Sequence, residues 1–349
     1  HVRLLAEKQA ALGHEVTVLV TNRAPVTSMG VQNGVRVIRA ARLVTVASTP
    51  LSLSLPLQLA RQRPDIAHLH FPYPVGEVSH YLLGRAERTV ISYHSDVIRQ
   101  KRLLWIYAPL MRRALRSCDR ILVSSENYLR TSTVLTPFRD KCRVVPYGID
   151  RQRFLAADPE AVRDLRGRYG PGPLILFVGV LRYYKGLTYL LQAMPQVEGR
   201  LLIVGDGPMA AILRSQAQAL GLGDKVIFLG SVPDEALPAH YHAADLFVLP
   251  ASERSEAFGL VQVEAMASGL PVVSTELGTG TSYVNQNGRT GLVVAPRDPA
   301  ALSTAINRLL SDKALRLRLA QGARLRSGRF DADRMAADIE AVYAELGSG

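Results

Sequence analysis

Two glutamates eight residues apart, Glu256 and Glu264, lie in one of the most apolar stretches of the 349-residue sequence. From Gly259 to Ser268 nearly every residue is Val, Leu, Ala, Met or Gly, and Gly-Leu-Pro follows at 269–271. This composition predicts a buried helix that ends at the Gly-Leu-Pro. A carboxylate inside such a helix needs a partner, because an unpaired buried charge is strongly destabilising or is neutralised. We therefore interpret both glutamates as ligand-binding, with Glu256 just before the helix and Glu264 about two turns into it.

The start of this helix, at "EAFG" (256–259), would expose free backbone N–H groups and the positive end of the helix dipole. Both features suit a phosphate. One glutamate would then contact a sugar and the other a ribose, on either side of a diphosphate. The alternative is structural: Glu256 caps the helix and Glu264 pairs with an internal arginine.

Two bases follow another predicted strand. The segment "FVGVLRYYKG" (177–186) reads as a strand to Val180, with Arg182 and Lys185 in the turn before a helix. Cations in such a turn are well placed to neutralise a diphosphate. The alternative is an ordinary solvated loop.

A glycine-rich turn follows a third strand, at "IVGDGPMAA" (203–211). Its Gly205-x-Gly207-x-x-Ala210 formally matches a dinucleotide-binding fingerprint, which would indicate NAD. Pro208 suits a pocket for a nucleotide base, or a simple turn, about equally well.

Other residues with reactive side chains give weaker signals. His94 ends the strand-like run "TVISYH" (89–94), at the edge where α/β sheets bind ligands, although a lone histidine there can also be structural. The only Asp-x-Asp, Asp331-Ala332-Asp333, precedes a helix instead of following a strand, so we expect helix capping there and no metal site. The sequence has no G-x-S-x-G, P-loop, H-E-x-x-H or zinc-type spacing.

A basic stretch follows His94, with the only tryptophan of the chain, Trp105, among its apolar residues. A basic amphipathic segment with a tryptophan indicates docking on anionic lipid, and the alternative is a domain helix with a solvated basic face. Pro109 argues against a single straight helix. The basic residues are Arg99, Lys101, Arg102, Arg112, Arg113, Arg116 and Arg120, and all but Arg120 are predicted to face a membrane together with Trp105.

These residues must be positioned by the elements around them. Continuous β-branched runs alternate with helical segments along the whole chain, which predicts parallel sheets covered on both faces. The Pro and Gly of "VVPYGIDRQRF" (144–154) indicate a linker. We predict an α/β domain at 1–150, a second at 151–329, and a terminal helix at 330–349.

The first residues read as a helix, a stop at Gly13 and then a strand, with no strand before the helix. In a doubly wound sheet the first strand is central, and its glycine-rich turn leads into the first helix. We therefore expect that strand and loop to precede His1 in the folded chain, because without them the two neighbouring strands have exposed edges.

Composition limits the class of protein. Hydrophobic residues make up 48% of the chain, enough for large cores, and no apolar run is long enough to span a bilayer. The net charge is +12, and residues 1–150 hold 21 Lys and Arg against 10 Asp and Glu, which accounts for +11 of it. The first half therefore faces something anionic. Two cysteines, Cys118 and Cys142, predict reduced thiols and not a disulfide framework.

Taken in order, these motifs resemble the family 4 glycosyltransferases. The resemblance covers essentially the whole chain and rests on "GHEVTVLV" (13–20), "YHSD" (93–96), "ILVSSE" (121–126), "VVPYGID" (144–150), "FVGVLRYYKG", "IVGDGP" (203–208), "VIFLGSV" (226–232), "ADLFVLPA" (244–251) and "SEAFGLVQVEAMASGLPVV" (255–273). It implies the GT-B architecture: two Rossmann-like, doubly wound parallel-sheet domains facing across a cleft. The first would bind the acceptor and the second the nucleotide sugar, with the terminal helix crossing back to the first.

The resemblance also implies roles for the motif residues. Glu256 would contact the donor sugar, Glu264 the nucleotide ribose, and His94 the donor sugar and reacting centre. Arg182 and Lys185 would neutralise the departing diphosphate. The remaining donor-binding positions are the backbone at Phe258, Gly259 and Leu260 and the base-pocket loops with Gly205, Asp206, Gly207, Pro208, Ser231 and Val232.

The implied reaction is transfer of a hexose from a nucleotide sugar to a hydroxyl with retention of configuration, without a metal or cofactor. "LGTGTSYVNQNGRTGLVV" (277–294) resembles bacterial mannosyl- and rhamnosyl-transferases of surface polysaccharides, which favours GDP-mannose as donor over a UDP-hexose. The acceptor would be a glycan or lipid-linked glycan, and the protein cytoplasmic or peripheral on the inner face of the plasma membrane, without nucleic acid. Two rival hypotheses stay open: an NAD-dependent oxidoreductase, and a non-catalytic basic protein that binds membrane or nucleic acid.

Overall fold

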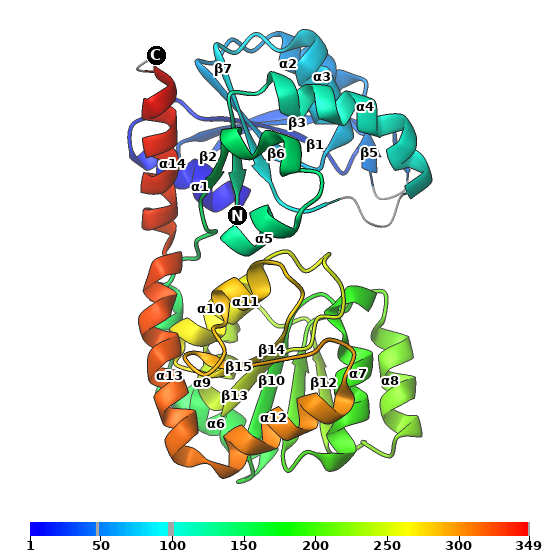
Figure 1. Ribbon diagram of the computed structural model, residues 1–349, viewed down its shortest axis with the longest axis vertical. Coiled ribbons are helices and arrows are strands. Elements are labelled where there is room, and N and C mark those ends of the chain that lie inside the picture. Colours follow the sequence, from blue (N-terminus) through cyan, green and yellow to red (C-terminus); the bar gives the residue numbers. More distant parts are fainter. Residues whose placement is uncertain (47–48, 97–100, 348–349) are drawn as a thin grey trace. The chain divides into compact units, whose positions relative to one another are not determined.

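The computed structural model describes residues 1–46, 49–96 and 101–347, and the side chains of 101–106 are not described. The chain divides into two units, which Figure 1 shows in the colours of the sequence. The first unit comprises His1–Tyr147 and the residues from Ala332 onward, and the second comprises Gly148–Asp331. The sequence analysis put these boundaries at 150/151 and 329/330.

The second unit is built on one six-stranded parallel sheet, in the order β12-β11-β10-β13-β14-β15. All residues of β10 and β13, at its centre, are buried, so both faces of the sheet are covered. This agrees with the continuous apolar runs of the sequence. The strands are β10 (Leu174–Val178), β11 (Arg200–Val204), β12 (Val226–Gly230), β13 (Leu246–Leu249), β14 (Val272–Thr275) and β15 (Gly291–Val294).

Helices follow the strands of this unit and cover the sheet. Helix α7 packs against α8 and α12, α6 packs against α9, and α10 packs against α13. Their bounds are α6 (Pro159–Tyr169), α7 (Leu187–Ala193), α8 (Ala210–Ala219), α9 (Leu237–Ala243), α10 (Leu260–Ala267), α11 (Gly280–Val284), α12 (Pro299–Ser311) and α13 (Lys313–Ser327). Short 3-10 helices at η2 (Gln152–Phe154), η3 (Tyr183–Lys185), η4 (Met194–Gln196), η5 (Asp234–Ala236) and η6 (Gly328–Phe330) connect them.

The first unit is also α/β, but its described strands form separate sheets. One has the order β1-β3-β2, one β6-β7-β8-β9, and β4 pairs with β5. All pairs within the four-stranded sheet are parallel, as is the pair of β1 with β3. The strands are β1 (Thr17–Thr21), β2 (Ser28–Gln32), β3 (Val35–Ala40), β4 (Val44–Val46), β5 (Thr49–Leu51), β6 (Ile66–Phe71), β7 (Arg88–Tyr93), β8 (Arg120–Val123) and β9 (Cys142–Val144).

Strand β1 and strand β6 each end a sheet, so each has one edge without a partner strand among the described residues. The helices of this unit are α1 (Val2–Ala11), α2 (Ser54–Ala60), α3 (Pro74–Leu83), α4 (Lys101–Ser117), α5 (Glu126–Thr131) and α14 (Ala332–Gly347), with η1 at Thr136–Lys141.

Two local features of the first unit add detail to the sequence analysis. Strand β2 is an additional antiparallel partner of β3, and the turn between them is Asn33-Gly34, both with positive φ. Asn-Gly is the residue pair that a tight hairpin turn favours. In the basic segment a single helix, α4, runs from Lys101 to Ser117 with Pro109 inside it.

The last helix, α14, contributes to the core of the first unit. Its apolar side chains form a buried cluster with residues of α1, β7 and β8. Polar contacts fasten it further, because Glu340 accepts a hydrogen bond from Gln9 and Tyr343 bonds His68. The chain thus returns to its first domain after completing the second. The cluster consists of Leu5, Val90, Leu122, Val145, Met335, Ile339, Val342 and Leu346.

Candidate functional site

The strand order of the second unit marks one position on the sheet. The chain moves outward from β10 to β11 and β12, and then returns to place β13, β14 and β15 on the other side of β10. Ligands of open α/β sheets bind at the carboxyl ends of the strands, where the order reverses in this way. In this unit the reversal lies between β10 and β13. The loop after β10 carries Arg182 and Lys185, and the loop after β13 carries Glu256.

The two loops are joined by an ion pair. Lys185 Nζ lies 2.5 Å from Glu256 Oε2, and the side chains are only 11% and 9% exposed. An ion pair this sheltered from water is screened far less than a surface pair. The structure therefore brings together two residues that the sequence analysis had assigned to one site from motifs 71 positions apart.

Backbone contacts hold the loops in register. Gly186 has φ +71°, and a Cβ on it would lie 1.8 Å from the Pro250 carbonyl oxygen. The Ser252 amide donates to the Tyr184 carbonyl over 2.8 Å. Because Gly186 has no side chain, the β10 loop can approach the β13 loop closely enough for the ion pair to form.

The segment after β14 supports the backbone around Glu256. The Thr279 hydroxyl donates to the Glu256 carbonyl over 2.8 Å, and the Gly280 amide donates to the Ala257 carbonyl over 2.7 Å. Phe258 is only 3% exposed. Gly259 is left-handed at φ +78° and Leu260 is the first residue of α10. Thr279 and Gly280 were not identified from the sequence as supports of this backbone.

Glu264 lies about one turn into α10 and not two, because the helix starts at Leu260. Its Oε2 accepts a hydrogen bond of 2.7 Å from the hydroxyl of Tyr241, in α9. The internal partner is therefore a tyrosine and not the arginine of the structural alternative. Burial raises the pKa of Glu264, and the hydrogen bond from Tyr241 and then the charge of Arg153 oppose that shift.

Arg182 differs from Lys185 in its surroundings. It is exposed, and its side chain has no hydrogen bond or ion pair with any other residue that the structure describes. Its guanidinium is thus available to an anion at the same edge of the sheet.

The glycine-rich loop after β11 has a structural explanation. A Cβ on Gly205 would lie 2.1 Å from the Gly179 carbonyl oxygen, and one on Gly207 would lie 2.7 Å from backbone atoms of Leu181. The Leu181 amide also donates to the Asp206 carbonyl over 2.9 Å. These glycines are required because two loops cross closely, which accounts for the fingerprint without NAD.

The other residues predicted for the base pocket lie on the surface of this edge. Asp206 and Pro208, after β11, are exposed. Ser231, after β12, is exposed, and Val232 is half-buried. All of them follow the carboxyl ends of parallel strands, so they share an edge of the sheet with Lys185 and Glu256.

His94 lies in the first unit, directly after β7. Its Nε2 is 2.9 Å from Nδ1 of His70, and its Nδ1 is 2.5 Å from the hydroxyl of Tyr147. Burial, followed by the charges of His70 and the amino terminus, lowers the pKa of His94 to about 3, so its ring is neutral. Both ring nitrogens therefore have partners inside this unit. Sequence analysis did not identify His70 or Tyr147.

Asp96 of "YHSD", two residues after His94, is hydrogen-bonded within the first unit. Its Oδ1 accepts hydrogen bonds from the hydroxyls of Tyr93 and Ser132, at 2.8 and 2.7 Å. Its amide donates to the hydroxyl of Tyr128 over 2.6 Å. These bonds hold Asp96 itself in place within the first unit.

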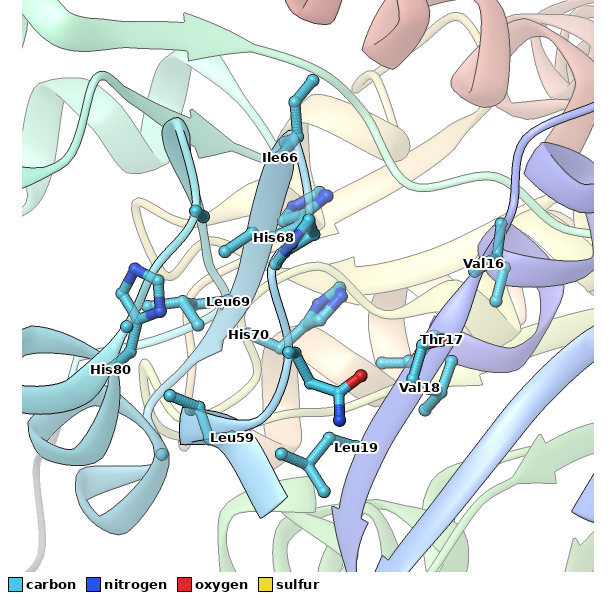
Figure 2. Close-up of a pocket in the computed structure, with 18 of the residues that line it drawn as sticks. Val16, Thr17, Val18, Leu19, Leu59, Ile66, His68, Leu69, His70 and His80 are labelled. Carbon is cyan, nitrogen blue, oxygen red and sulfur yellow. The ribbon is translucent and has the colours of Figure 1, made fainter. Parts of the chain in front are cut away.

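The first unit also contains a large cavity. It has a volume of about 1130 Å³ and is lined by β1 and β6 from opposite sides, with α1 residues contributing to it. Figure 2 shows Thr17, Val18 and Leu19 on one side and His68 and His70 on the other. No residue predicted for donor binding or catalysis lines it. The cavity lies along the unpaired edges of the two strands, and His70, which lines it, is the residue that contacts His94.

The structure describes the side chains of only some of the predicted membrane-facing residues. Arg112, Arg113 and Arg116 are exposed on α4. Arg99 lies outside the described residues, as do the side chains of Lys101, Arg102 and Trp105. Among the helices that the structure describes, none combines the length and hydropathy needed to cross a bilayer.

The remaining reactive groups in the described part of the chain form no cluster of the metal-binding kind. Over residues 1–46, 49–96 and 101–347 no three His, Cys, Asp or Glu side chains are grouped so that they could hold a metal ion. Asp333 forms an ion pair of 2.5 Å with Lys8. Cys118 and Cys142 are buried free thiols, as predicted.

Comparison with known proteins identifies the chain. Residues 1–153 match "Glycosyltransferase Family 4" and residues 160–326 match "Glycosyl transferases group 1". The chain is 43% identical over 305 residues to the D-rhamnosyltransferase WbpZ of Pseudomonas aeruginosa, an alignment that covers 86% of this chain and 79% of that protein. It is 38% identical over 314 residues to the O-antigen chain mannosyltransferase C of Escherichia coli, with coverage of 89% and 84%.

Solved structures agree with the sequence matches. A sucrose-phosphate synthase from Thermosynechococcus elongatus superposes with a TM-score of 0.81 at 27% identity, and the match covers 99% of this chain and 92% of that one. These similarities favour the transferase over the NAD-dependent oxidoreductase and the non-catalytic binding protein. The chain belongs to the family 4 (group 1) glycosyltransferases, has their two-domain GT-B fold, and is a glycosyltransferase.

Proposed function

We propose that this enzyme transfers a hexose from a nucleotide sugar to a hydroxyl of a glycan or lipid-linked glycan during synthesis of a surface polysaccharide. Mannose from GDP-mannose is the favoured donor, because the relatives include a mannosyltransferase and a rhamnosyltransferase by name. A UDP-hexose is the second candidate. The observation that carries the proposal is the sheltered pair of Lys185 and Glu256 at the strand-order reversal, with Glu264 on the helix that follows.

The diphosphate of the donor would lie beside the cations of the β10 loop. Lys185 is already held by Glu256, and Arg182 is exposed and without a described partner. A diphosphate gains negative charge as the bond to the sugar breaks, and fixed cations stabilise that charge more in the transition state than in the ground state. Backbone amides at the start of α10, from Phe258 to Leu260, would add donors to the same phosphate.

The sugar would lie next to Glu256, whose carboxylate can accept hydrogen bonds from its hydroxyls. Transfer then breaks the bond between the anomeric carbon and the phosphate oxygen and forms one to the acceptor oxygen. The acceptor would attack the same face of the sugar that the phosphate leaves, through an oxocarbenium-like state, so the configuration would be retained. The acceptor proton passes to the departing phosphate, so no nucleophilic side chain is needed. We expect the reaction to proceed without a metal ion or cofactor.

The remaining predicted residues would select the donor and acceptor. Glu264 would accept a hydrogen bond from the ribose, and the loops after β11 and β12 would border the base. His94 would contact the donor sugar as a neutral imidazole. The exposed arginines of α4 would hold the first domain on an anionic membrane that carries a lipid-linked acceptor.

Binding and hydrolysis of candidate donors test this proposal. Thermal stabilisation and sugar release would be measured with GDP-mannose, UDP-glucose, UDP-GlcNAc and NAD, for the wild type, Glu256→Gln and Glu253→Gln. Glu253 is the matched control, since it lies in the same loop but pairs with Arg297. We expect one sugar nucleotide to stabilise the protein and Glu256→Gln alone to abolish sugar release. Stabilisation by NAD alone, or equal activity of both variants, would refute the proposal.

A further inference from the structure

The contact between Tyr241 and Glu264 is not used by the reaction as described above. Tyr241 is fully buried, at 0% exposure, near the end of α9. Its ring meets that of Phe154 edge-on, with centroids 5.7 Å apart and an interplanar angle of 82°, and lies 5.9 Å from that of Phe247. The ring is therefore fixed by aromatic neighbours on both η2 and β13.

The hydroxyl of this fixed ring is directed at the carboxylate. It donates to Glu264 Oε2 over 2.7 Å, a short hydrogen bond of the kind made to an ionised acceptor. The other oxygen, Oε1, accepts no hydrogen bond from any residue that the structure describes. Glu264 is half-buried, so this oxygen is not closed off by the core.

The geometry gives the two oxygens of the Glu264 carboxylate different roles. We propose that Tyr241 is a positioning residue: it occupies one oxygen of Glu264 and so presents the other to a ribose hydroxyl of the bound nucleotide. A carboxylate on a flexible side chain loses rotamer freedom when it binds, and a partner that fixes it beforehand reduces that cost. The inference rests on the proposed donor site, because it names how one residue of that site is held.

The charged groups around the carboxylate are consistent with this role. Arg153 and Lys185 favour its ionised form, and Asp234 disfavours it. Neither cation forms a hydrogen bond or ion pair with Glu264, since Lys185 pairs with Glu256 and Arg153 donates to the Asp234 carbonyl. Tyr241 is thus the residue that sets the orientation, whereas the cations contribute only charge.

Nucleotide binding tests the inference. Affinities of the wild type and Tyr241→Phe would be measured by calorimetry for GDP, 2′-deoxy-GDP and 3′-deoxy-GDP, with the corresponding UDP series run in parallel. In the wild type we expect one deoxy compound to bind about tenfold more weakly than its parent, the value of one hydrogen bond to a charged group. Tyr241→Phe should bind the parent about tenfold more weakly and lose most of that discrimination.

A matched control separates positioning from stability. Tyr169→Phe removes the hydroxyl of another buried tyrosine of the same unit, on α6, and should leave all affinities unchanged. Glu264→Gln combined with Tyr241→Phe should be no weaker than Glu264→Gln alone, because both changes act through one contact.

The pH dependence gives a further readout. The Tyr241 hydrogen bond lowers the pKa of Glu264, so Tyr241→Phe should move the loss of nucleotide affinity to higher pH as the carboxyl is protonated. Equal discrimination in both proteins, or an unchanged pH profile, would overturn the inference while leaving the proposed function intact. Failure of the wild type to bind any nucleoside diphosphate would overturn both.

Discussion

Replacing Lys185 should destabilise the folded protein, because Glu256 would stay buried without its cation. In Lys185→Met the methionine roughly keeps the volume of the lysine stem, while the buried Glu256 side chain loses its cation. Removing one member of a buried ion pair costs about 3–5 kcal/mol, because the remaining charge stays out of water. The side chains of Lys185 and Glu256 are only 11% and 9% exposed. We therefore use the lower end of that range and do not reduce it further for screening of the charges by water.

The expected cost corresponds to a measurable change in melting temperature. For a unit of this size each kcal/mol lowers Tm by about 2–4 °C, so a loss of about 3 kcal/mol gives about 6–12 °C. Differential scanning calorimetry of the whole chain would record it. Lys185→Met combined with Glu256→Gln removes both charges and should recover most of the loss.

The melting temperature at pH 7 decides this prediction. A Tm within 1–2 °C of the wild type at pH 7, about the uncertainty of such a comparison, would refute the reasoning, as would a double variant no more stable than Lys185→Met.

Three further predictions concern the loops and the thiols. Gly186→Ala should destabilise the protein and reduce sugar transfer together, measured by calorimetry and a donor assay, because its Cβ would meet the Pro250 carbonyl at 1.8 Å. Arg182→Ala should leave Tm unchanged and lower kcat about 10²-fold, the scale for removing one group that stabilises developing charge; an unchanged kcat would contradict its role. Cys118 and Cys142, whose thiol pKa values burial raises to about 12 and about 11, should react with iodoacetamide at pH 8 only after unfolding, as mass spectrometry would show.

The sequence was most informative about the second domain. Buried parallel strands are recorded directly as apolar, β-branched runs, so β10, β11 and β13 could be located without the structure. The residues predicted for the donor site follow those strands, so locating the strands also locates these residues. Lys185 and Glu256 could be assigned to one site because both follow strands at one edge of a parallel sheet, but their ion pair was not predicted.

Other features left weaker traces or none. The β2–β3 hairpin had a local signal, the Asn33-Gly34 turn between alternating residues, which the analysis did not use. The hydrogen bond from Tyr241 to Glu264 left no signal in the sequence. It joins two helices, and no sequence pattern indicates which of their residues meet. The glycines at 205 and 207 were visible, but only the structure shows that they accommodate the backbone of a neighbouring loop and not a dinucleotide.

The most direct test of the central claim is a crystal structure of the enzyme soaked with its stabilising sugar nucleotide. The account predicts that the diphosphate lies at the carboxyl ends of β10 and β13, within hydrogen-bonding distance of Lys185 or Arg182 and the first amides of α10. Glu264 should contact the ribose. A nucleotide bound in the cavity between β1 and β6, or one that contacts neither Lys185 nor Glu264, would contradict it.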